Sequence, residues 1–374
     1  MRVLFIERSL GRGGAQRQLV ALAIGLARRG HDVTVALFYD EGPLIRDLRE
    51  SGVRLQVLGK RSRWDVLGFL RSTLRLLRVE KPDIICTFLQ VPNLVAATCK
   101  LLRPRLRLAW GVRASNMDLQ RYDRLTRLSY QLEIIGSRLA NVVISNSNTG
   151  RNSALAKGFQ ADKVVVIANG IDTERFQPDL LGRRRLREAW NVADAETLVG
   201  LIGRLDPMKD HRTFIRAAAL VAAERPDMHF VCVGDEKPIL REDLAALAAS
   251  VGLGSRMIWS AGRDDMPAVF SACDVVCSSS AYGEGFSNTL AEAMACGRRC
   301  VATDVGDALD IVGSTGYVVP PGDEKALADG IAKLCREVKI DGETNAAARQ
   351  RIENSFSIDT MVSGFEDQFR RLIT

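Results

Sequence analysis

Residues 283–297 read GEGFSNTLAEAMACG, an apolar segment bounded by glycines. This pattern predicts a buried helix that ends at Gly297, because glycine readily takes the left-handed conformation that follows many helices. Ser287 or its neighbour can cap the start of the helix. Glu284 then lies in the preceding loop, whereas Glu292 lies about five residues into the helix. The stretch therefore places two carboxylates around the positive end of a buried helix.

The backbone at this helix start predicts an anion site. Residues 286–289 present N–H groups that lack a partner within the helix, so a phosphate is expected there. Glu292 lies roughly 7 Å along the axis, which suits a diol beside the phosphates. Glu284 is expected on the other flank of the ligand. Taken alone, each carboxylate is better explained as a loop charge or as part of a solvated helix face.

Strand and helix patterns alternate outside this stretch. Short apolar runs predict strands, and 3.6-residue periods predict helices between them. The alternation indicates an α/β fold with parallel sheets that helices cover on both faces. The expected strands are 2–7, 32–38, 54–58, 83–88, 106–112, 141–146, 163–169, 198–204, 229–234, 256–262, 274–280, 298–303 and 316–320. The expected helices include 16–29, 64–79, 122–139, 148–157, 211–224, 241–251, 267–272, 288–296, 324–336 and 359–372.

The same order of elements occurs twice, so two doubly wound, Rossmann-like units are expected. A single core rarely fills a chain of 374 residues. The boundary is expected after the NGID segment at 169–172, where residues 178–190 read as a Pro-led polar connection. The last helix follows no strand and can pack back onto the first unit. The expected domains are 1–170 with about 356–374, and 171–355.

Composition favours a soluble, cytoplasmic protein. No apolar run reaches about 18 residues, and residues 1–7 are too short for a secretory signal. The eight cysteines lie mostly in apolar stretches, as is typical of reduced, buried thiols. Zinc sites favour tighter spacing than the pairs Cys273/Cys277 and Cys296/Cys300 provide, so no metal site is expected.

A glycine-rich turn follows the first strand. Gly11, Gly13 and Gly14 precede a helix, where glycine allows the backbone to approach a ligand closely. A dinucleotide fingerprint would need a small residue where Gln16 stands, so NAD binding is disfavoured. Simple turn geometry and contact with a substrate both remain open at this position.

The second unit opens with a strand that ends in GRLDPMKDH, residues 203–211. Gly203 permits a close approach, and Arg204 and Lys209 can reach one point from either side of the turn. A planar guanidinium and a point charge together suit a diphosphate. In isolation such residues are usually solvated, but their place after a parallel strand favours a ligand.

Together these motifs resemble the retaining glycosyltransferases of family 4, which have the two-domain GT-B fold. The resemblance covers the whole chain and rests on the two glutamates eight residues apart, on the set Gly203, Arg204 and Lys209, on the Gly13/Gly14 loop and on NGID. It implies two Rossmann-like domains facing across a cleft, with the C-terminal helix crossing back to the N-terminal domain. It also implies a nucleotide-sugar donor, a UDP-sugar in particular, held mainly by the C-terminal domain.

The resemblance assigns roles to individual residues. Arg204 and Lys209 would neutralise the diphosphate leaving group, and Glu292 would hold the ribose. Arg263 falls in the loop that resembles the base pocket, and the Gly13/Gly14 loop would contact the phosphates or the acceptor. Many relatives place a histidine near the fifth strand of the first domain, where this chain has Arg113 and Asn116 on the acceptor or sugar side. The sugar would be held by Glu284 with Gly285, Phe286, Ser287, Asn288 and Thr289.

The mechanism is expected to need no metal or other cofactor. No Asp-x-Asp motif stands where a metal would bridge the phosphates; the nearest acidic pair, Asp264–Asp265, lies in the base-side loop. The charge of the leaving group would then fall on Arg204, on Lys209 and on a helix terminus. Glu284 completes the expected catalytic set. Retention of the anomeric configuration is implied by the resemblance alone.

The distribution of charged residues along the chain predicts which half of the protein meets the acceptor. Residues 1–170 carry 28 Lys and Arg against 13 Asp and Glu, whereas residues 171–374 carry 24 against 32. The basic half is expected to meet an anionic membrane surface that carries a lipid-linked glycan acceptor, in cell-envelope or exopolysaccharide synthesis. The protein would then be cytoplasmic and peripheral on the inner face of the membrane. The basic groups are Arg71, Arg75 and Arg78 on one helix face, Lys60, Arg61 and Arg63 before it, and the cluster Lys100, Arg103, Arg105 and Arg107.

Two other classes remain as alternatives. UDP-sugar 2-epimerases share the architecture but need acid–base groups for proton abstraction, and no such set stands out. A nucleic-acid-binding protein would interleave aromatic and basic residues, yet aromatics make up only 6% of the chain. The preferred prediction is transfer of a hexose or N-acetylhexosamine from a UDP-sugar, without nucleic acid as a partner.

Overall fold

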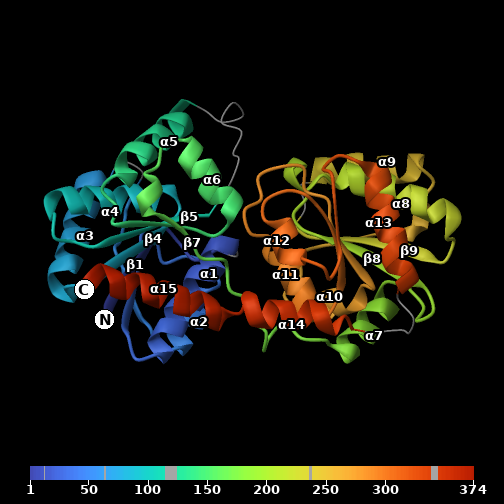
Figure 1. Ribbon diagram of the computed structural model, residues 1–374, viewed down its shortest axis with the longest axis horizontal. Coiled ribbons are helices and arrows are strands. Elements are labelled where there is room, and N and C mark those ends of the chain that lie inside the picture. The colour runs from blue at the N-terminus through green and yellow to red at the C-terminus, as the bar shows by residue number, and fades with distance from the viewer. Residues whose placement is uncertain (12, 63–64, 114–123, 236–237, 338–343) are drawn as a thin grey trace. The chain divides into compact units, whose positions relative to one another are not determined.

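The computed structural model describes residues 1–11, 13–62, 65–113, 124–235, 238–337 and 344–374 (Figure 1). The chain forms two compact units. Unit 1 comprises Met1–Gly170 and Ile358–Thr374, and unit 2 comprises Ile171–Ser357. The first boundary falls at the position that the sequence suggests, and the return to unit 1 begins at Ile358 rather than at about 356.

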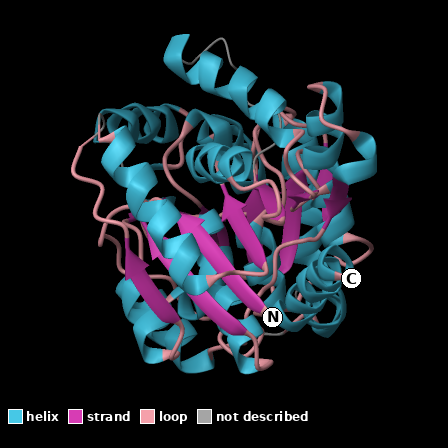
Figure 2. Ribbon diagram, turned by 90° about the vertical axis from the view of Figure 1, so that its left-hand side faces the viewer, coloured by secondary structure: helices cyan, strands magenta, loops and turns pink. Residues whose placement is uncertain are grey.

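Unit 1 is built on a parallel sheet with the strand order β3-β2-β1-β4-β5-β6-β7 (Figure 2). The central strands are almost wholly buried because helices cover both faces of the sheet. The direction of winding reverses between β1 and β4, which makes a topological switch point at the carboxyl edge. The strands are β1 (Arg2–Glu7), β2 (Asp32–Leu37), β3 (Arg54–Val57), β4 (Ile84–Phe88), β5 (Leu108–Val112), β6 (Val142–Ser145) and β7 (Val164–Val166).

The two faces of this sheet carry separate hydrophobic cores. One face buries alternate β1 residues such as Val3 and Phe5 against α1 (Gly14–Arg28), α2 (Ile45–Glu50) and α15 (Ile358–Ile373). The opposite face buries Leu4 and Ile6. Its helices are α3 (Val66–Glu80), α4 (Gln90–Leu102), α5 (Arg124–Ser137) and α6 (Asn148–Ala156), and the 3-10 turn η2 (Ala161–Lys163) precedes β7.

Helix α15 is attached to unit 1 by charge as well as by apolar packing. Glu366 accepts hydrogen bonds from Arg29 Nη1 at 3.0 Å and from Arg370 Nη2 at 2.6 Å, and it lies 3.0 Å from His31 Nε2. Hydrogen bonding by Arg370 and Arg29 lowers the pKa of Glu366 to about 2. The last helix therefore belongs to the first unit, as its sequence position without a following strand suggests.

Unit 2 has a parallel sheet with the order β10-β9-β8-β11-β12-β13. The strands are β8 (Thr197–Ile202), β9 (Met228–Val233), β10 (Met257–Ser260), β11 (Val275–Ser278), β12 (Arg299–Thr303) and β13 (Tyr317–Val319). Its helices are α7 (Leu180–Ala189), α8 (His211–Glu224), α9 (Pro238–Ser250), α10 (Met266–Ala272), α11 (Asn288–Ala295), α12 (Ala308–Val312), α13 (Glu324–Glu337) and α14 (Ala346–Ser355), with 3-10 turns η3 (Pro207–Lys209) and η4 (Gly254–Arg256).

The prediction of a polar connection at residues 178–190 is wrong. This segment contains α7, in which Arg183 and Arg187 are buried. Arg183 Nη2 donates to Asp274 Oδ1 at 2.9 Å, and Arg187 Nη1 donates to Asp274 Oδ2 at 3.2 Å. The carboxylate of Asp274, which is remote in sequence, thus pairs with both arginines. This pairing allows α7 to be buried although its sequence is polar. The structure also contains α2, α4, α12 and α14, which the apolar periods alone do not single out.

In the part of the chain that the structure describes, no helix combines the length and apolar character of a membrane span.

Candidate active site

Three loops converge at the carboxyl edge of the unit 2 sheet, after β8, β11 and β12. The loop after β11 is hydrogen-bonded to the loop after β8 through Ser279 Oγ, which donates to Lys209 O at 2.8 Å. Thr303 Oγ1, at the end of β12, donates to Ser280 O at 2.6 Å. Because β8 and β11 flank the switch point of this sheet, the converging loops occupy the place where doubly wound folds bind ligands.

The loop after β8 positions a lysine over a glycine. A Cβ added at Gly203 would lie 3.4 Å from Lys209 Cε, so the absence of a side chain leaves room for the lysine stem. The turn η3 carries Lys209, and Asp210 follows in the left-handed conformation with φ of 45°. Asp210 then caps α8 by accepting a hydrogen bond from Thr213 N. Asp206 caps the turn η3 by accepting a hydrogen bond from Met208 N, so two caps fix the backbone that carries Lys209.

Lys209 and Glu284 contact each other directly. Lys209 Nζ donates to Glu284 Oε1 at 2.5 Å, and Ser280 Oγ donates to the same oxygen at 2.8 Å. The side chains of Lys209 and Glu284 are only 17% and 12% exposed. Arg204 is exposed and forms no ion pair with any residue that the structure describes. The solvated-loop explanation is therefore wrong for Glu284, which is a half-buried partner of Lys209.

The start of α11 has no side-chain cap. Ser287 occupies the N-cap position, but its side chain makes no cap hydrogen bond, so the expectation of a serine cap is wrong at this residue. The Ser287 hydroxyl is buried and has no hydrogen-bond partner among the residues that the structure describes. The uncapped helix start leaves backbone N–H groups to which an anionic ligand can bind. Asn288 and Thr289 form the first helical positions, and the helix ends before Gly297 with its φ of 68°.

Glu292 is the fifth residue of α11 and is only 5% exposed. The solvated-face explanation is therefore wrong for this residue too.

The loop that holds Glu284 is hydrogen-bonded to the segment after β12, because Gly285 O accepts a hydrogen bond from Asp307 N at 3.0 Å. A Cβ added at Gly306 would lie 2.3 Å from Gly285 O, so only glycine fits there. Phe286 is buried and packs against Phe356 with ring centroids 5.3 Å apart.

Arg263 lies in the loop between β10 and α10, away from the three converging loops along the sequence. Its Nε and Nη2 donate to the two oxygens of Asp265 at 2.7 and 2.9 Å. The hydrogen bond with Arg263 lowers the pKa of Asp265, and the hydrogen bond with Asp265 raises the pKa of Arg263. The sequence analysis rejects the pair Asp264–Asp265 as a metal site. In the structure, Asp265 of this pair is the partner of Arg263, the arginine predicted on the base side.

The remaining expected residues belong to unit 1. Gly13 is the N-cap of α1 and Gly14 its first residue; a Cβ added at Gly13 would lie 2.3 Å from Gln16 Oε1. Arg113 follows β5 and donates from Nη1 to Asn169 Oδ1 at 3.1 Å. Asn116 lies outside the described residues. The structure therefore places the glycine loop and Arg113 in one unit and the donor-side residues in the other.

Sequence reasoning misses Ser280. Ser280 is the last of three consecutive serines, the first of which ends β11, and its hydroxyl donates a hydrogen bond to Glu284. A run of small polar residues at a carboxyl strand end is the signal that could have identified it. His211 is the first residue of α8 and is buried, which lowers its pKa to about 4.

Comparisons with known proteins define the class. The model described as glycosyl transferases group 1 matches residues 196–337, and the model described as glycosyltransferase family 4 matches residues 12–175. Together with two doubly wound units, these matches define a glycosyltransferase of the GT-B fold. The chain belongs to the family 4 glycosyltransferases, and it is a transferase enzyme.

Several curated relatives are bacterial glycosyltransferases. The N-acetylgalactosamine-N,N'-diacetylbacillosaminyl-diphospho-undecaprenol 4-alpha-N-acetylgalactosaminyltransferase of Campylobacter jejuni is 25% identical over 89% of each chain. The mannosyltransferase LpsB of Rhizobium meliloti, named for lipopolysaccharide core biosynthesis, is 30% identical over 52% of this chain and 57% of that protein. A GDP-mannose-dependent phosphatidylinositol monomannoside mannosyltransferase of Mycobacterium tuberculosis is 29% identical over 74% of each chain.

Solved structures share the fold over the full length. Anabaena Alr3699/HepE, solved in complex with UDP, has a TM-score of 0.86 at 24% identity and covers 99% of this chain and 100% of that one. A glycosyltransferase from Rickettsia africae has a TM-score of 0.85 at 19% identity and covers 100% and 98%. At this level of identity the likeness establishes the fold.

Proposed function

We propose that this enzyme transfers a sugar from a UDP-sugar to a hydroxyl of a lipid-linked saccharide, with retention and without a metal. The observation that carries the proposal is the Lys209–Glu284 contact beside the uncapped start of α11, with Glu292 buried in the same helix. The arrangement supplies one cation, one helix terminus and two carboxylates at a single edge of the sheet. These are the groups that a diphosphate linked to two polyols requires.

In this proposal the residues of unit 2 divide the donor between them. Lys209 and Arg204 take the diphosphate with the backbone of residues 286–289, and Glu292 takes the ribose diol. Glu284 accepts hydrogen bonds from sugar hydroxyls, and Arg263 lies toward the base. The anomeric C–O bond to the diphosphate breaks as the bond to the acceptor oxygen forms. The proton of the attacking hydroxyl leaves with the diphosphate.

The identity of the donor is the finer part of the proposal. A UDP-sugar is favoured by the name of the Anabaena structure, which records UDP, whereas one relative is named for GDP-mannose. A panel of UDP- and GDP-sugars scored by thermal shift tests this, since a bound donor raises the melting temperature by mass action. Stabilisation by a UDP-sugar supports the proposal, and stabilisation by GDP-mannose alone overturns its choice of nucleotide.

The acceptor is proposed to be met at an anionic membrane surface. Arg71, Arg75 and Arg78 are exposed together on α3. Two apolar side chains at the end of α4, Leu101 and Leu102, are 64% and 57% exposed. Exposed cations and exposed apolar groups on two contacting helices of unit 1 suit the lipid interface. Release of UDP from a UDP-sugar in the presence of a lipid-linked acceptor is the decisive assay, and turnover that survives both Lys209→Ala and Glu292→Ala would refute the assignment.

A further inference from the structure

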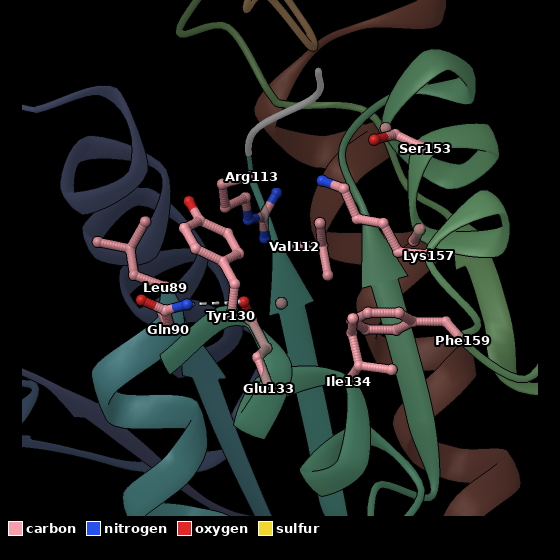
Figure 3. Close-up of a pocket in the computed structure, with 13 residues that line it drawn as sticks. Leu89, Gln90, Val112, Arg113, Tyr130, Glu133, Ile134, Ser153, Lys157 and Phe159 are labelled. Carbon is pink, nitrogen blue, oxygen red and sulfur yellow. Dashed lines mark hydrogen bonds between the residues drawn. The ribbon is translucent and has the colours of Figure 1, made fainter. Parts of the chain in front are cut away.

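A cavity of about 90 Å³ lies in unit 1 beside the carboxyl end of β5. Its walls come from the start of α4, the end of β5, and helices α5 and α6 (Figure 3). An apolar cavity of about 150 Å³ holds a benzene molecule, and one water molecule takes roughly 30 Å³ of liquid. The volume therefore suits a chemical group of about four non-hydrogen atoms.

Two half-buried charged side chains, Glu133 of α5 and Lys157 of α6, form part of the wall. Figure 3 shows both side chains turned toward the end of β5. Burial raises the pKa of Glu133 and lowers the pKa of Lys157, and the charge of each opposes the effect of burial on the other. The two charges therefore interact at a distance, and no ion pair joins them in the described part of the chain.

The ammonium of Lys157 has unused hydrogen-bonding capacity. Its Nζ lies 5.9 Å from the centre of the Tyr130 ring, and no residue that the structure describes accepts a hydrogen bond from it. Unlike the unpaired nitrogens of Arg17 and Trp110, Nζ is not among the buried atoms that solvent cannot touch. A ligand in the cavity can therefore accept a hydrogen bond from Lys157.

The carboxyl of Glu133 is held in place by two amides and can still accept from a ligand. Gln90 Nε2 donates to Oε2 at 3.3 Å, and Asn93 Nδ2 donates to Oε1 at 3.2 Å. A carboxylate has about four acceptor positions, so these two bonds leave capacity for another donor. Gln90 follows Leu89, which alone joins β4 to α4 and has φ of 66° and ψ of 163°. Such strain persists where the surrounding structure fixes a site.

Arg113 belongs to the wall but is not the contact for a ligand. Its Nη1 donates to Asn169 Oδ1 at 3.1 Å, and its Nε and Nη2 are inaccessible to solvent. The guanidinium stacks on Phe88, with Cζ 3.7 Å from the ring centre. The charged contacts open to a ligand are therefore one donor, Lys157 Nζ, and one acceptor, the Glu133 carboxyl.

Apolar side chains, among them Val112, Ile134 and Phe159, complete the lining. Figure 3 shows Ile134 and Phe159 apart from the ammonium of Lys157. Glu133 disfavours an anion and Lys157 disfavours a cation, so the lining suits a neutral group that both donates and accepts. An acetamido group has four non-hydrogen atoms: an N–H for the carboxyl, a C=O for the ammonium, and a methyl group for the apolar side chains.

We infer that this cavity binds the acetamido group of an N-acetylated sugar in the acceptor. Glu133 accepts from the amide N–H, and Lys157 donates to the amide carbonyl. The inference rests on the proposed function, since it names the chemical class of the acceptor of that reaction. A hydroxyl in the same place leaves the apolar side chains without a contact, and an ammonium is repelled by Lys157.

Ligand-observed NMR on the full chain tests the inference. The probes are methyl N-acetylglucosaminide, methyl glucoside and methyl glucosaminide, which carry an acetamido, a hydroxyl and an ammonium group at the same carbon. The N-acetylated probe is expected to bind roughly tenfold or more tightly than the other two. Saturation transfer from the protein is expected to be strongest at its acetyl methyl group, a result that depends on no variant.

Lys157→Met keeps a long side chain and removes the donor. The variant is expected to bind the N-acetylated probe roughly tenfold or more weakly and to lose most of its preference over methyl glucoside. The matched control is Lys163→Met. Lys163 is a half-buried lysine of the same unit that lies outside the lining and donates to Arg138 O at 2.8 Å. The control leaves binding unchanged, and thermal unfolding of both variants checks that they fold.

The outcomes separate this inference from the proposed function. Equal binding of methyl glucoside by the wild-type chain, or an unchanged preference in folded Lys157→Met, overturns the inference. If Lys157→Met does not fold, the wild-type preference and the saturation of the methyl group decide. UDP affinity is measured on the wild-type chain: UDP binding without a preference for the N-acetylated probe overturns the inference alone. Failure of the wild-type chain to bind UDP would instead refute the proposed function.

Discussion

Lys209 Nζ lies 2.5 Å from Glu284 Oε1, although 75 positions separate the two residues in sequence. One residue comes from the loop after β8 and the other from the loop after β11. Each charge satisfies the other inside a half-buried site. The contact holds both groups in place, and we expect Lys209 to turn to the diphosphate when the donor binds.

Replacing Lys209 and replacing Glu284 are expected to have different effects on catalysis and on UDP binding. Lys209→Ala removes a cation from the leaving group and should lower turnover roughly 10²- to 10³-fold. Glu284→Gln removes the competitor of the diphosphate for Lys209, so UDP binding should be maintained or improved while sugar transfer falls. Steady-state kinetics and UDP titration measure the two effects. Lys325→Ala, at an exposed position of the same unit, is the control. Equal loss of UDP affinity in both variants would contradict the exchange of partners.

Glu292 is expected to recognise the ribose. Glu292→Ala should weaken UDP binding by roughly tenfold or more, since hydrogen bonds to a charged group contribute about 1.5–3 kcal/mol. The wild-type enzyme should also prefer UDP to 2′-deoxy-UDP, and the variant should lose that preference. Calorimetric titration of both nucleotides against both proteins gives the four affinities. An unchanged preference in the variant would assign the diol to another residue.

Transfer is expected to continue without divalent metal. The positive charge at the proposed diphosphate site comes from Lys209, from Arg204 and from the start of α11. UDP release should therefore persist after treatment with EDTA and desalting. A rate that collapses under this treatment and returns with Mg²⁺ or Mn²⁺ would show that the protein charges are insufficient.

The exposed arginines of α3 are expected to bind anionic membranes. Replacing Arg71, Arg75 and Arg78 together by Gln should weaken binding to vesicles rich in anionic lipid by roughly a hundredfold, at about 1 kcal/mol per charge. Vesicle sedimentation measures this, with neutral vesicles as the reference. Substitution of Arg184, Lys325 and Lys333 removes the same charge from unit 2 and should have little effect. Equal losses in the two triple variants would mean that net charge alone governs binding.

Glu7 is expected to make stability depend on pH. It is buried at the end of β1, where Oε1 accepts from Arg8 N at 2.8 Å and Oε2 has no partner in the described part of the chain. Burial raises its pKa from 4.5 to about 7. A carboxyl with a raised pKa in the folded state favours folding below its unfolded pKa, and this contribution is lost as the pH rises through the folded value.

Glu7→Gln removes the ionisable group and therefore the loss of stability that its ionisation causes at high pH. The variant is expected to be more stable than the wild type at about pH 8, by on the order of 2–3 kcal/mol, and to show little or no such gain near pH 4. Thermal or urea unfolding at both pH values gives the comparison. A gain that is equal at both pH values would show that ionisation of Glu7 is not its source.

Much of the fold follows from local pattern. The predicted helix at 211–224 coincides with α8, and the predicted helix at 288–296 differs from α11 by one residue at its end. Both are framed by local signals, a capping Asp210 in one case and Gly297 in the other. Helix α7 is missed because its burial depends on Asp274, which no local signal connects to Arg183 and Arg187.

The sequence by itself determines the two doubly wound units and the loops that carry the donor-side residues, because apolar period, glycine and capping residues act over a few positions. Only the tertiary structure decides that Lys209 is paired with Glu284, and that Arg183 and Arg187 share Asp274. It also decides that the Ser287 hydroxyl is buried without a partner among the described residues. The physical reason is that pairing and desolvation depend on distances between segments remote in sequence. A charge can be read from the sequence, but its partner cannot.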